Sequence, residues 1–499
     1  MTSSSTAIKK SLKDNYKQVW AVFVAIVVAI ALGFVMVDES SVVEAVVVAA
    51  IALICMVKWP DITTLLVIFL IYANVGPVAV KFMGVPSYAA TAIFLILVIP
   101  LIWYIIIRRE KIIITPVLQL LLLLGAIYSL SAAFSSDITL ATPQLTEFFA
   151  EGLLLFFLIT NIVRTPQMLK RVVWVLLIAG GLIGGLSLYQ QMTKTFDNNY
   201  YGFAQVESSF GTGVQSLQGQ VLQPRLAGSV GEKNRYGQNM MMLIPLGLFQ
   251  LWIYHSTWKR ILALVLTGLI AVGGMLSFSR GAAVGFVLMI VIMVVLRYIK
   301  FSQLLLLLVG VGLIFWLFPQ YGLRLTSLNV VAELAAPDSG PALAGADNAV
   351  VDRASLMLAS ALVFKDHPLL GVGPGMTRYY TEDYAKQIGL SSITGNYQPH
   401  DLYIGMAADA GIFGLICFLL ILFVPLRDLA ITRKKWVVKR PDISYLATAF
   451  SISLISYMVT GLFLHLSYYR FFYLMLALAV VASTFKDLQE SEEIKQLQA

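Results

Sequence analysis

Four residues of this sequence have side chains that can do chemistry at the edge of an apolar segment. His400 opens a hydrophobic segment in the run QPHDLY, and its imidazole can exchange a proton near neutral pH. Arg280, in SFSRGA, lies where two apolar segments are joined by almost no loop. Arg353 and Arg225 lie in more polar stretches. A charge beside lipid is costly unless it is paired or hydrated, so each is a candidate functional residue.

Each candidate also has a simpler interpretation. Arg280 can extend its charge to the membrane interface, the other two arginines can be solvated charges, and one histidine at an interface can be an anchor. Glu147 and Glu151 lie four residues apart on one face of an apolar helix. They can neutralise Arg280 or Arg470, or they can line a polar cavity.

Sequence patterns bear on two further kinds of site, a phosphate-binding turn and a metal or cofactor site. The glycine turn LGVGPGM at 370–376 is of a kind whose backbone can approach a phosphate, but a bare pattern of this kind is weak. Neither the four histidines nor Cys55 and Cys417 have the spacing of metal ligands, and no dinucleotide or phosphate-binding fingerprint occurs. We therefore expect no metal and no cofactor.

The elements that position these residues are membrane helices. The 499 residues are 59% hydrophobic and 12% charged, with a mean hydropathy of +0.83. Apolar runs of about 20 residues match the thickness of a bilayer, and period-2 alternation is absent, so we predict an all-α polytopic integral membrane protein. The fourteen predicted spans lie near 19–37, 42–57, 62–80, 88–107, 112–134, 145–163, 170–190, 236–254, 259–277, 281–298, 302–318, 402–424, 443–465 and 470–485.

The basic residues predict the orientation. With the N-terminus in the cytoplasm and the first run kept as a span, 23 of the 35 lysines and arginines fall on the cytoplasmic side, mostly in short loops. The net charge of +8 is thus a topology signal, and no motif for binding nucleic acid accompanies it. The predicted parts are 1–190 with helices 1–7, an outer loop 191–235, 236–318 with helices 8–11, a large outer loop 319–401, and 402–499 with helices 12–14 and a cytoplasmic tail.

The large outer loop has internal structure of its own. Residues 335–346 are rich in Pro, Gly and Ala and are typical of a flexible connector. An amphipathic helix follows at about Asn348–Lys365 and is closed by His367 and Pro368. This helix would carry Arg353 on the same outer side as Arg280 and His400.

Taken together, residues of about 200–425 resemble the O-antigen ligase and polymerase family. Its members transfer glycans from undecaprenyl-diphosphate carriers on the periplasmic face of the bacterial inner (cytoplasmic) membrane. His400-Asp401, nine residues, Gly411, two residues and Gly414 are similar to the family's signature of a histidine, then Asn, Ser or Gln, and two spaced small residues. The elements Ser279–Ala282, Asp352-Arg353 and Pro368–Gly375 follow the family's order. Asp401 departs from the signature, and its carboxylate could raise the basicity of the imidazole.

The resemblance implies a GT-C-like bundle and a metal-independent, inverting transfer. Arg280 and Arg353 would bind the diphosphate, and His400 would be the general base. Residues expected to assist in binding donor or acceptor are Arg225, Tyr403 and Arg470. The implied partners are an undecaprenyl-diphosphate-linked oligosaccharide donor, a glycan, lipid A core or protein hydroxyl acceptor, membrane lipids, and a chain-length regulator or other polysaccharide assembly proteins.

Two other classes of function fit part of the sequence. A transporter or flippase for an anionic lipid-linked saccharide would also have many spans and a basic cavity, but transporters usually bind at the midplane of the membrane. The second class is a structural subunit of a polysaccharide assembly complex. Within the enzyme interpretation, the sequence does not decide between polymerase and ligase.

Overall fold

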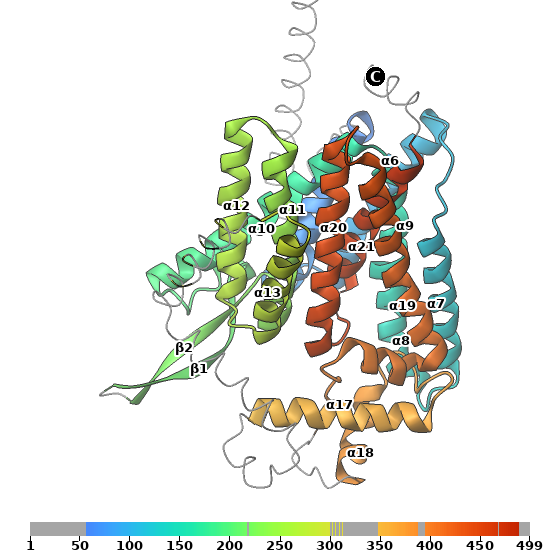
Figure 1. The fold of residues 1–499 in the computed structure, drawn as a ribbon. Coiled ribbons are helices and arrows are strands. Elements are labelled where there is room, and N and C mark those ends of the chain that lie inside the picture. Colours follow the sequence, from blue (N-terminus) through green and yellow to red (C-terminus); the bar gives the residue numbers. More distant parts are fainter. Residues whose placement is uncertain are drawn as a thin grey trace, which may run out of the picture.

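The computed structural model describes residues 56–216, 219–299, 348–387, 395–467 and 469–488, with four single residues between 302 and 312. These parts form a bundle of upright helices (Figure 1). The predicted spans at 19–37, 42–57 and 302–318 and the connector at 335–346 lie almost entirely outside the described residues. The remaining spans can be compared with the structure one by one.

Most of the bundle is α-helical. The helices are α3 (Pro60–Tyr72), α4 (Val75–Met83), α5 (Ser87–Leu95), α6 (Val98–Ile102), α7 (Pro116–Ala133), α8 (Ile138–Glu147), α9 (Leu155–Ile162), α10 (Pro166–Thr193), α11 (Lys233–Ile253), α12 (Thr257–Met275), α13 (Arg280–Val295), α17 (Asn348–Asp366), α18 (Thr381–Gln387), α19 (Leu402–Trp436), α20 (Pro441–Thr460) and α21 (Tyr469–Thr484). Two π-helical segments, Trp103–Ile107 and Phe148–Leu154, continue α6 and α8. Short 3₁₀ turns lie at Tyr200–Gly202, Thr377–Tyr379, Gly461–Phe463 and Phe485–Asp487.

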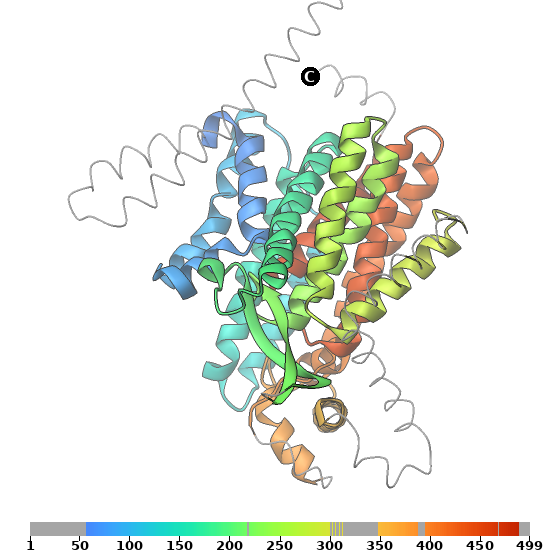
Figure 2. The same cartoon turned by 90° about the vertical axis from the view of Figure 1, so that its left-hand side faces the viewer.

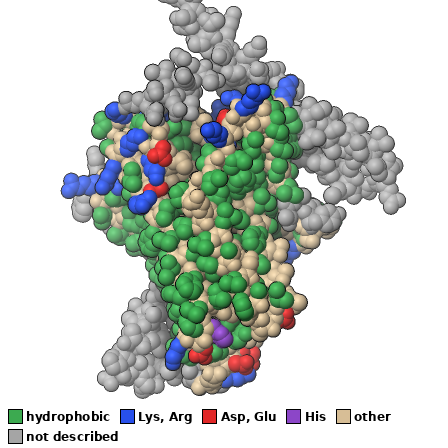
Figure 3. Space-filling view, turned by 90° about the vertical axis from the view of Figure 1, so that its right-hand side faces the viewer, with side chains coloured by type: hydrophobic (Ala, Val, Ile, Leu, Met, Phe, Trp, Pro, Cys, Tyr) green, Lys and Arg blue, Asp and Glu red, His purple; other side chains and the backbone are tan. Residues whose placement is uncertain are grey.

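Among the described residues, seven helical stretches are long and apolar enough to cross a membrane. One of them, Ile138–Ile162, is made of α8, the π-helical segment and α9. The number rises to eight if α3 and α4, which meet at a bend of 55°, form one span. Figure 3 shows hydrophobic side chains covering the middle of the molecule, with most of the visible Lys and Arg side chains toward its upper end. The chain is therefore a mostly helical membrane protein, and a total of fourteen spans stays a prediction.

Local sequence explains where several spans begin. Thr115 and Thr165 each precede a proline, and their side chains accept hydrogen bonds from the backbone N–H of Leu118 and Met168. A threonine cap followed by proline starts a helix, because it satisfies a free amide and fixes φ. At the centre of the bundle, α21 is buried along almost its whole length and packs against α9, α19 and α20.

The first predicted outer loop, 191–235, contains a β-hairpin that the sequence analysis did not predict. Strands β1 (Gln205–Ser216) and β2 (Gly219–Gly228) are antiparallel, with Val206 opposite Leu226. The strands are rich in Gly, Ser and Gln and lack regular apolar alternation, so the usual strand signal is missing. In this part of the chain the expectation of an all-α fold was wrong.

Helix α17 lies across one end of the bundle, on the side of the hairpin (Figures 1 and 2). Its bounds, Asn348–Asp366, agree with the amphipathic helix predicted at Asn348–Lys365, and it ends before His367 and Pro368. His400, just before α19, lines one cavity with Arg353 of α17 and Arg225 of β2, and Arg225 also hydrogen-bonds the turn that precedes Arg280 of α13. The candidate residues are thus brought to one end of the molecule.

Candidate active site

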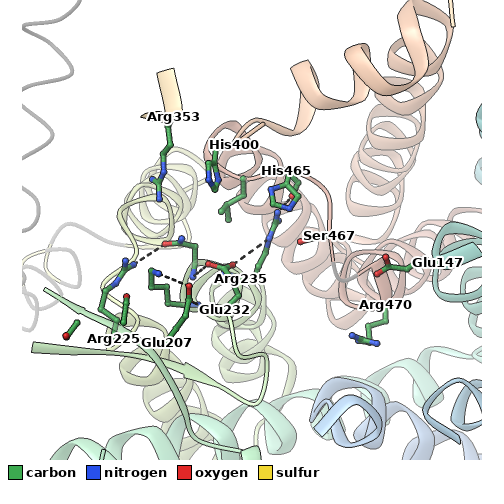
Figure 4. A pocket seen from close by; sticks show the side chains of 15 residues that line it. Glu147, Glu207, Arg225, Glu232, Arg235, Arg353, His400, His465, Ser467 and Arg470 are labelled. Carbon is green, nitrogen blue, oxygen red and sulfur yellow. Dashed lines mark hydrogen bonds and ion pairs between the residues drawn. The ribbon is translucent and has the colours of Figure 1, made fainter. Parts of the chain in front are cut away.

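A cavity of about 730 Å³ lies at the end of the bundle that carries α17 and the hairpin. Five basic side chains, three carboxylates and two histidines contribute to its wall, and they come from α8, the hairpin, α11 and its N-cap, α17, α21 and the segments around His400 and His465 (Figure 4). The lining residues are Glu147, Glu207, Ser208, Ser209, Arg225, Glu232, Lys233, Asn234, Arg235, Arg353, His400, Leu464, His465, Ser467 and Arg470.

The N-terminus of α11 supplies two of the basic residues. Glu232 caps this helix, because its carboxylate accepts hydrogen bonds from the N–H groups of Asn234 and Arg235. Arg235 is buried, and its guanidinium donates to the backbone oxygen of His465 and, over 3.1 Å, to Gln238 Oε1. The Nζ of Lys233 lies 2.8 Å from Glu207 Oε1. The cap therefore fixes the basic residues that follow it.

Arg225 lines the cavity and also holds a turn together. Its Nε donates to the carbonyl of Ser277 over 2.9 Å, and its Nη2 donates to Phe278 O and Asn234 Oδ1 over 3.2 and 3.1 Å. Phe278 has a φ of 49°, so this turn is strained. The turn leads directly into α13, and Arg225 thereby helps to position Arg280.

His400 meets conditions that keep its imidazole neutral. Burial, together with the positive charges of Arg353, Arg235 and Lys233, lowers the pKa of His400 to about 4. Its Nδ1 is buried and has no hydrogen-bond partner among the described residues. A neutral imidazole at physiological pH can accept a proton.

A second imidazole lies next to the first. The rings of His400 and His465 have centroids 6.0 Å apart and are tilted by 59°. Burial lowers the pKa of His465 well below its usual value, and the charge of Arg235 adds to this effect. The Nδ1 of His465 also has no hydrogen-bond partner in the described part of the chain.

Asp401 has a structural role that the sequence analysis did not assign to it. Its Oδ1 accepts hydrogen bonds from Tyr403 N over 2.8 Å and Ile404 N over 2.7 Å, so Asp401 is the N-cap of α19. No hydrogen bond joins it to His400 within the described residues. The carboxylate of Asp401 is therefore not placed to raise the basicity of the His400 imidazole, as the sequence had suggested. Asn and Ser, which the signature has at this position, are good N-caps, and so is Asp.

Gly411 joins the loop after α17 to α19. Within α19 it has φ 67° and ψ −168°, which is backbone that only glycine adopts readily. A Cβ atom there would lie 2.1 Å from the carbonyl oxygen of Leu369. At this break the loop forms hydrogen bonds with α19, from Ile412 N to Pro368 O over 2.8 Å and from Val372 N to Ala408 O over 3.0 Å. The signature glycine thus connects the element that carries Arg353 to the helix that follows His400.

Asp409 strengthens the same junction. Its carboxylate accepts hydrogen bonds from Gly375 N over 2.9 Å and from Thr377 N over 3.1 Å, and Gly373 N donates to the Asp409 backbone oxygen over 3.0 Å. The amides of the glycine turn are therefore used in packing against α19. The interpretation of this turn as a phosphate-binding backbone was wrong.

The structure brings four of the six candidate residues to the cavity wall: Arg225, Arg353, His400 and Arg470. Tyr403 does not line it, because its hydroxyl donates to Met458 O on α20 over 2.8 Å. Arg280 does not line the cavity either; it is the first residue of α13 and follows the turn that Arg225 holds, and a Cβ atom at its neighbour Gly281 would lie 3.4 Å from Phe463.

The carboxylates on the apolar helix are near Arg470. Glu151 Oε1 lies 2.6 Å from Arg470 Nη1, and Glu147 lines the cavity. Glu151 therefore neutralises Arg470, and Glu147 lines a polar cavity, so each of the two alternatives raised from the sequence applies to one residue. Within the described residues, no group of three or more His, Cys, Asp or Glu side chains is placed to hold a metal ion.

Sequence reasoning missed Arg235, Lys233 and His465 as parts of the site. The first two follow Glu232 in the run GEKNRYGQN, just ahead of a predicted span, where charges are common. His465 lies in the segment between α20 and α21, and only the fold brings it to His400. The one signal available in the sequence was the acidic residue Glu232, which can cap a helix, just before Lys233 and Arg235.

Comparison with known protein families gives a match. Residues 264–419 match the model of a protein family described as O-antigen ligase. A comparison with curated proteins gives no match. The matched part runs from α12 through the first half of α19 and contains Arg280, Arg353, His400 and Gly411.

Proposed function

We propose that the chain, whose residues 264–419 match the family model described as O-antigen ligase, is a membrane glycosyltransferase that uses an undecaprenyl-diphosphate-linked glycan as donor. One observation carries the proposal. A neutral imidazole, His400, lines the same cavity as the guanidinium groups of Arg353 and Arg235. A proton acceptor and a binding site for a charged leaving group therefore share one space.

The basic residues suit a diphosphate leaving group. Negative charge on the diphosphate grows as the bond from the anomeric carbon to oxygen breaks, and guanidinium groups stabilise such charge through paired hydrogen bonds. Arg353 and Arg280 bind the diphosphate in this proposal, with Arg235 and Lys233 adding positive charge. The reaction then needs no divalent cation.

The transfer is a single displacement. The acceptor hydroxyl attacks the anomeric carbon and loses its proton to His400, while the carbon–oxygen bond to the diphosphate breaks and its electron pair leaves with the phosphate. The anomeric configuration inverts. The positive charges that lower the pKa of His400 are offset when the diphosphate binds, so the imidazole becomes a stronger base once the donor is in place.

We further propose that the cavity faces the periplasm of a bacterial inner membrane. The opposite end of the bundle carries a dense set of ion pairs, among them Arg164–Glu110, Lys170–Asp442 and Lys486–Asp428. Basic residues near short loops favour the cytoplasmic side. A lipid-linked sugar presented in the outer leaflet would then reach the basic wall of the cavity.

The test is transfer from a purified lipid-linked oligosaccharide by the full chain in detergent. Arg280→Ala, Arg353→Ala and His400→Ala should each lower the rate, and loss of a general base typically costs ~10²–10⁴-fold. Arg171→Ala is the control, because Arg171 pairs with Asp61 at the far end of the bundle and is 47% exposed. Wild-type rates in the three site variants would overturn the proposal. Movement of the substrate across proteoliposomes without a covalent product would favour a transporter.

A further inference from the structure

The cavity continues away from the basic residues toward a second polar region. Figure 4 shows Glu147 and Arg470 at one side of the cavity, opposite Arg225 and Glu207. His465 and Ser467 lie between His400 and this pair. Glu147, Ser467 and Arg470 line the cavity here, and Glu151 is paired with Arg470; we call this region the acidic side of the cavity, because it has two carboxyl groups and one guanidinium.

The acidic side is built on an irregular part of a membrane span. Helix α8 ends at Glu147, and the π-helical segment Phe148–Leu154 carries Glu151 before α9 continues the span. A π-helical turn has poorer packing than an α-helix and occurs often at functional sites. It sets Glu151 opposite Arg470 of the buried helix α21, with 2.6 Å between Oε1 and Nη1.

Several polar atoms of this region are buried and have no hydrogen-bond partner among the described residues. They are Arg470 Nε, Glu151 Oε2 and Ser467 Oγ. Arg470 as a whole is only 9% exposed, so its guanidinium is held away from bulk water. Buried polar groups in native proteins are nearly always paired, and two of these three belong to residues of the cavity wall, Arg470 and Ser467, which indicates a polar ligand.

The charges and the free groups indicate which ligand fits. Glu151 already compensates Arg470, and Glu147 is a second carboxyl group on this side, so a diphosphate would gain little net attraction here. Sugar hydroxyl groups both donate and accept hydrogen bonds, and they match an assembly of carboxylate acceptors, a guanidinium donor and a serine. A neutral pyranoside would satisfy these atoms without burying a new charge.

We propose that the acidic side of the cavity is the subsite for the acceptor sugar, and that it binds hydroxyl groups of a neutral pyranoside. Its role in the reaction rests on the proposed function. A sugar held by Glu147 and Arg470 lies on the His465 side of His400, away from the basic residues that bind the diphosphate. Donor and acceptor then approach the imidazole of His400 from different sides.

The test measures binding and transfer separately. Binding of a panel of neutral methyl pyranosides to the full chain in detergent is measured by saturation-transfer NMR, and binding of inorganic pyrophosphate by calorimetry. Glu147→Gln, which keeps the shape of the side chain, should weaken pyranoside binding about tenfold or more and leave pyrophosphate binding unchanged. Arg353→Ala should do the reverse. Glu382→Gln, a carboxylate of α18 paired with Lys386 at the surface, is the matched control and should change neither.

The outcomes separate this proposal from the proposed function. Absence of pyranoside binding in the wild type, binding of only a protonated amino sugar, or wild-type pyranoside affinity in Glu147→Gln would overturn the subsite. Transfer activity with an unchanged acceptor KM in Glu147→Gln would also overturn it, while the proposed function stands. The expected binding pattern without any glycosyl transfer would support the subsite and overturn the proposed function.

Discussion

Replacing Gly411 by alanine should separate the loop that follows α17 from α19. The backbone conformation at Gly411 costs a residue with a side chain about 1–3 kcal/mol. The new Cβ would lie 2.1 Å from Leu369 O and 2.2 Å from Leu369 C, and these backbone atoms cannot move without breaking the junction. Three backbone hydrogen bonds, from Ile412, Val372 and Gly373, depend on this approach, and each contributes about 0.5–1.5 kcal/mol. We therefore expect a loss of about 2.5–7.5 kcal/mol in local stability.

The loss should reach the reaction, because the loop connects the helix of Arg353 to the helix that follows His400. Gly411→Ala should lower the thermal midpoint of the purified protein in detergent and lower transfer from the lipid-linked donor at temperatures where the bundle is still folded. Gly268→Ala in α12 is the matched control, because among the described residues nothing lies within 4 Å of a Cβ atom at Gly268. An alanine in a helix interior is favoured over glycine by about 0.5–1 kcal/mol.

Two results would refute this reasoning. Wild-type stability and activity in Gly411→Ala would mean that the loop does not dock on α19 as described. Equal losses in Gly411→Ala and Gly268→Ala would mean that any added methyl group harms the bundle, and that the break in α19 has no special role.

Three further predictions concern the same end of the molecule. Because only the neutral imidazole of His400 accepts a proton and its pKa is about 4, kcat/KM for the donor should stay level near neutral pH and fall as the pH approaches 4. Arg353→Gln removes a positive charge that lowers this pKa, so its pH profile should fall at a higher pH. Asp409→Asn keeps one acceptor oxygen but turns the other into an NH2 group, so either Gly375 N or Thr377 N loses its acceptor, which should cost about 1–3 kcal/mol in thermal unfolding experiments. Arg225→Lys keeps the charge but loses the paired donation to Ser277 and Phe278, so the thermal midpoint should fall together with activity.

Much of the fold follows from local sequence. Apolar runs of membrane length, and caps such as Thr115 and Thr165 before prolines, are properties of short segments. The helix at Asn348–Asp366 has a clear end, since a histidine and a proline follow it. The hairpin was missed because the pairing of β1 with β2 depends on backbone hydrogen bonds and not on an apolar pattern.

Residues of the candidate site could be predicted where a charged or titratable side chain occurs beside an apolar segment. His400 and Arg353 were found in this way, and the structure brings both to one cavity. The glycine turn was misinterpreted because the partner of Gly375 is Asp409, on a helix that begins only after His400. Hydrogen bonds of this kind between distant residues come from tertiary packing, and no local sequence pattern in the turn indicates them.

The π-helical segment Phe148–Leu154 can also be described as a one-residue insertion in an ordinary helix. Deleting one residue from it would restore α-helical hydrogen bonding and rotate the two halves of the span by about 100° relative to each other. Glu147 and Glu151 could then no longer both face Arg470 while the apolar faces of α8 and α9 keep their partners. Homologues that share this chemistry should therefore keep the length of this segment more strictly than the identity of its apolar residues.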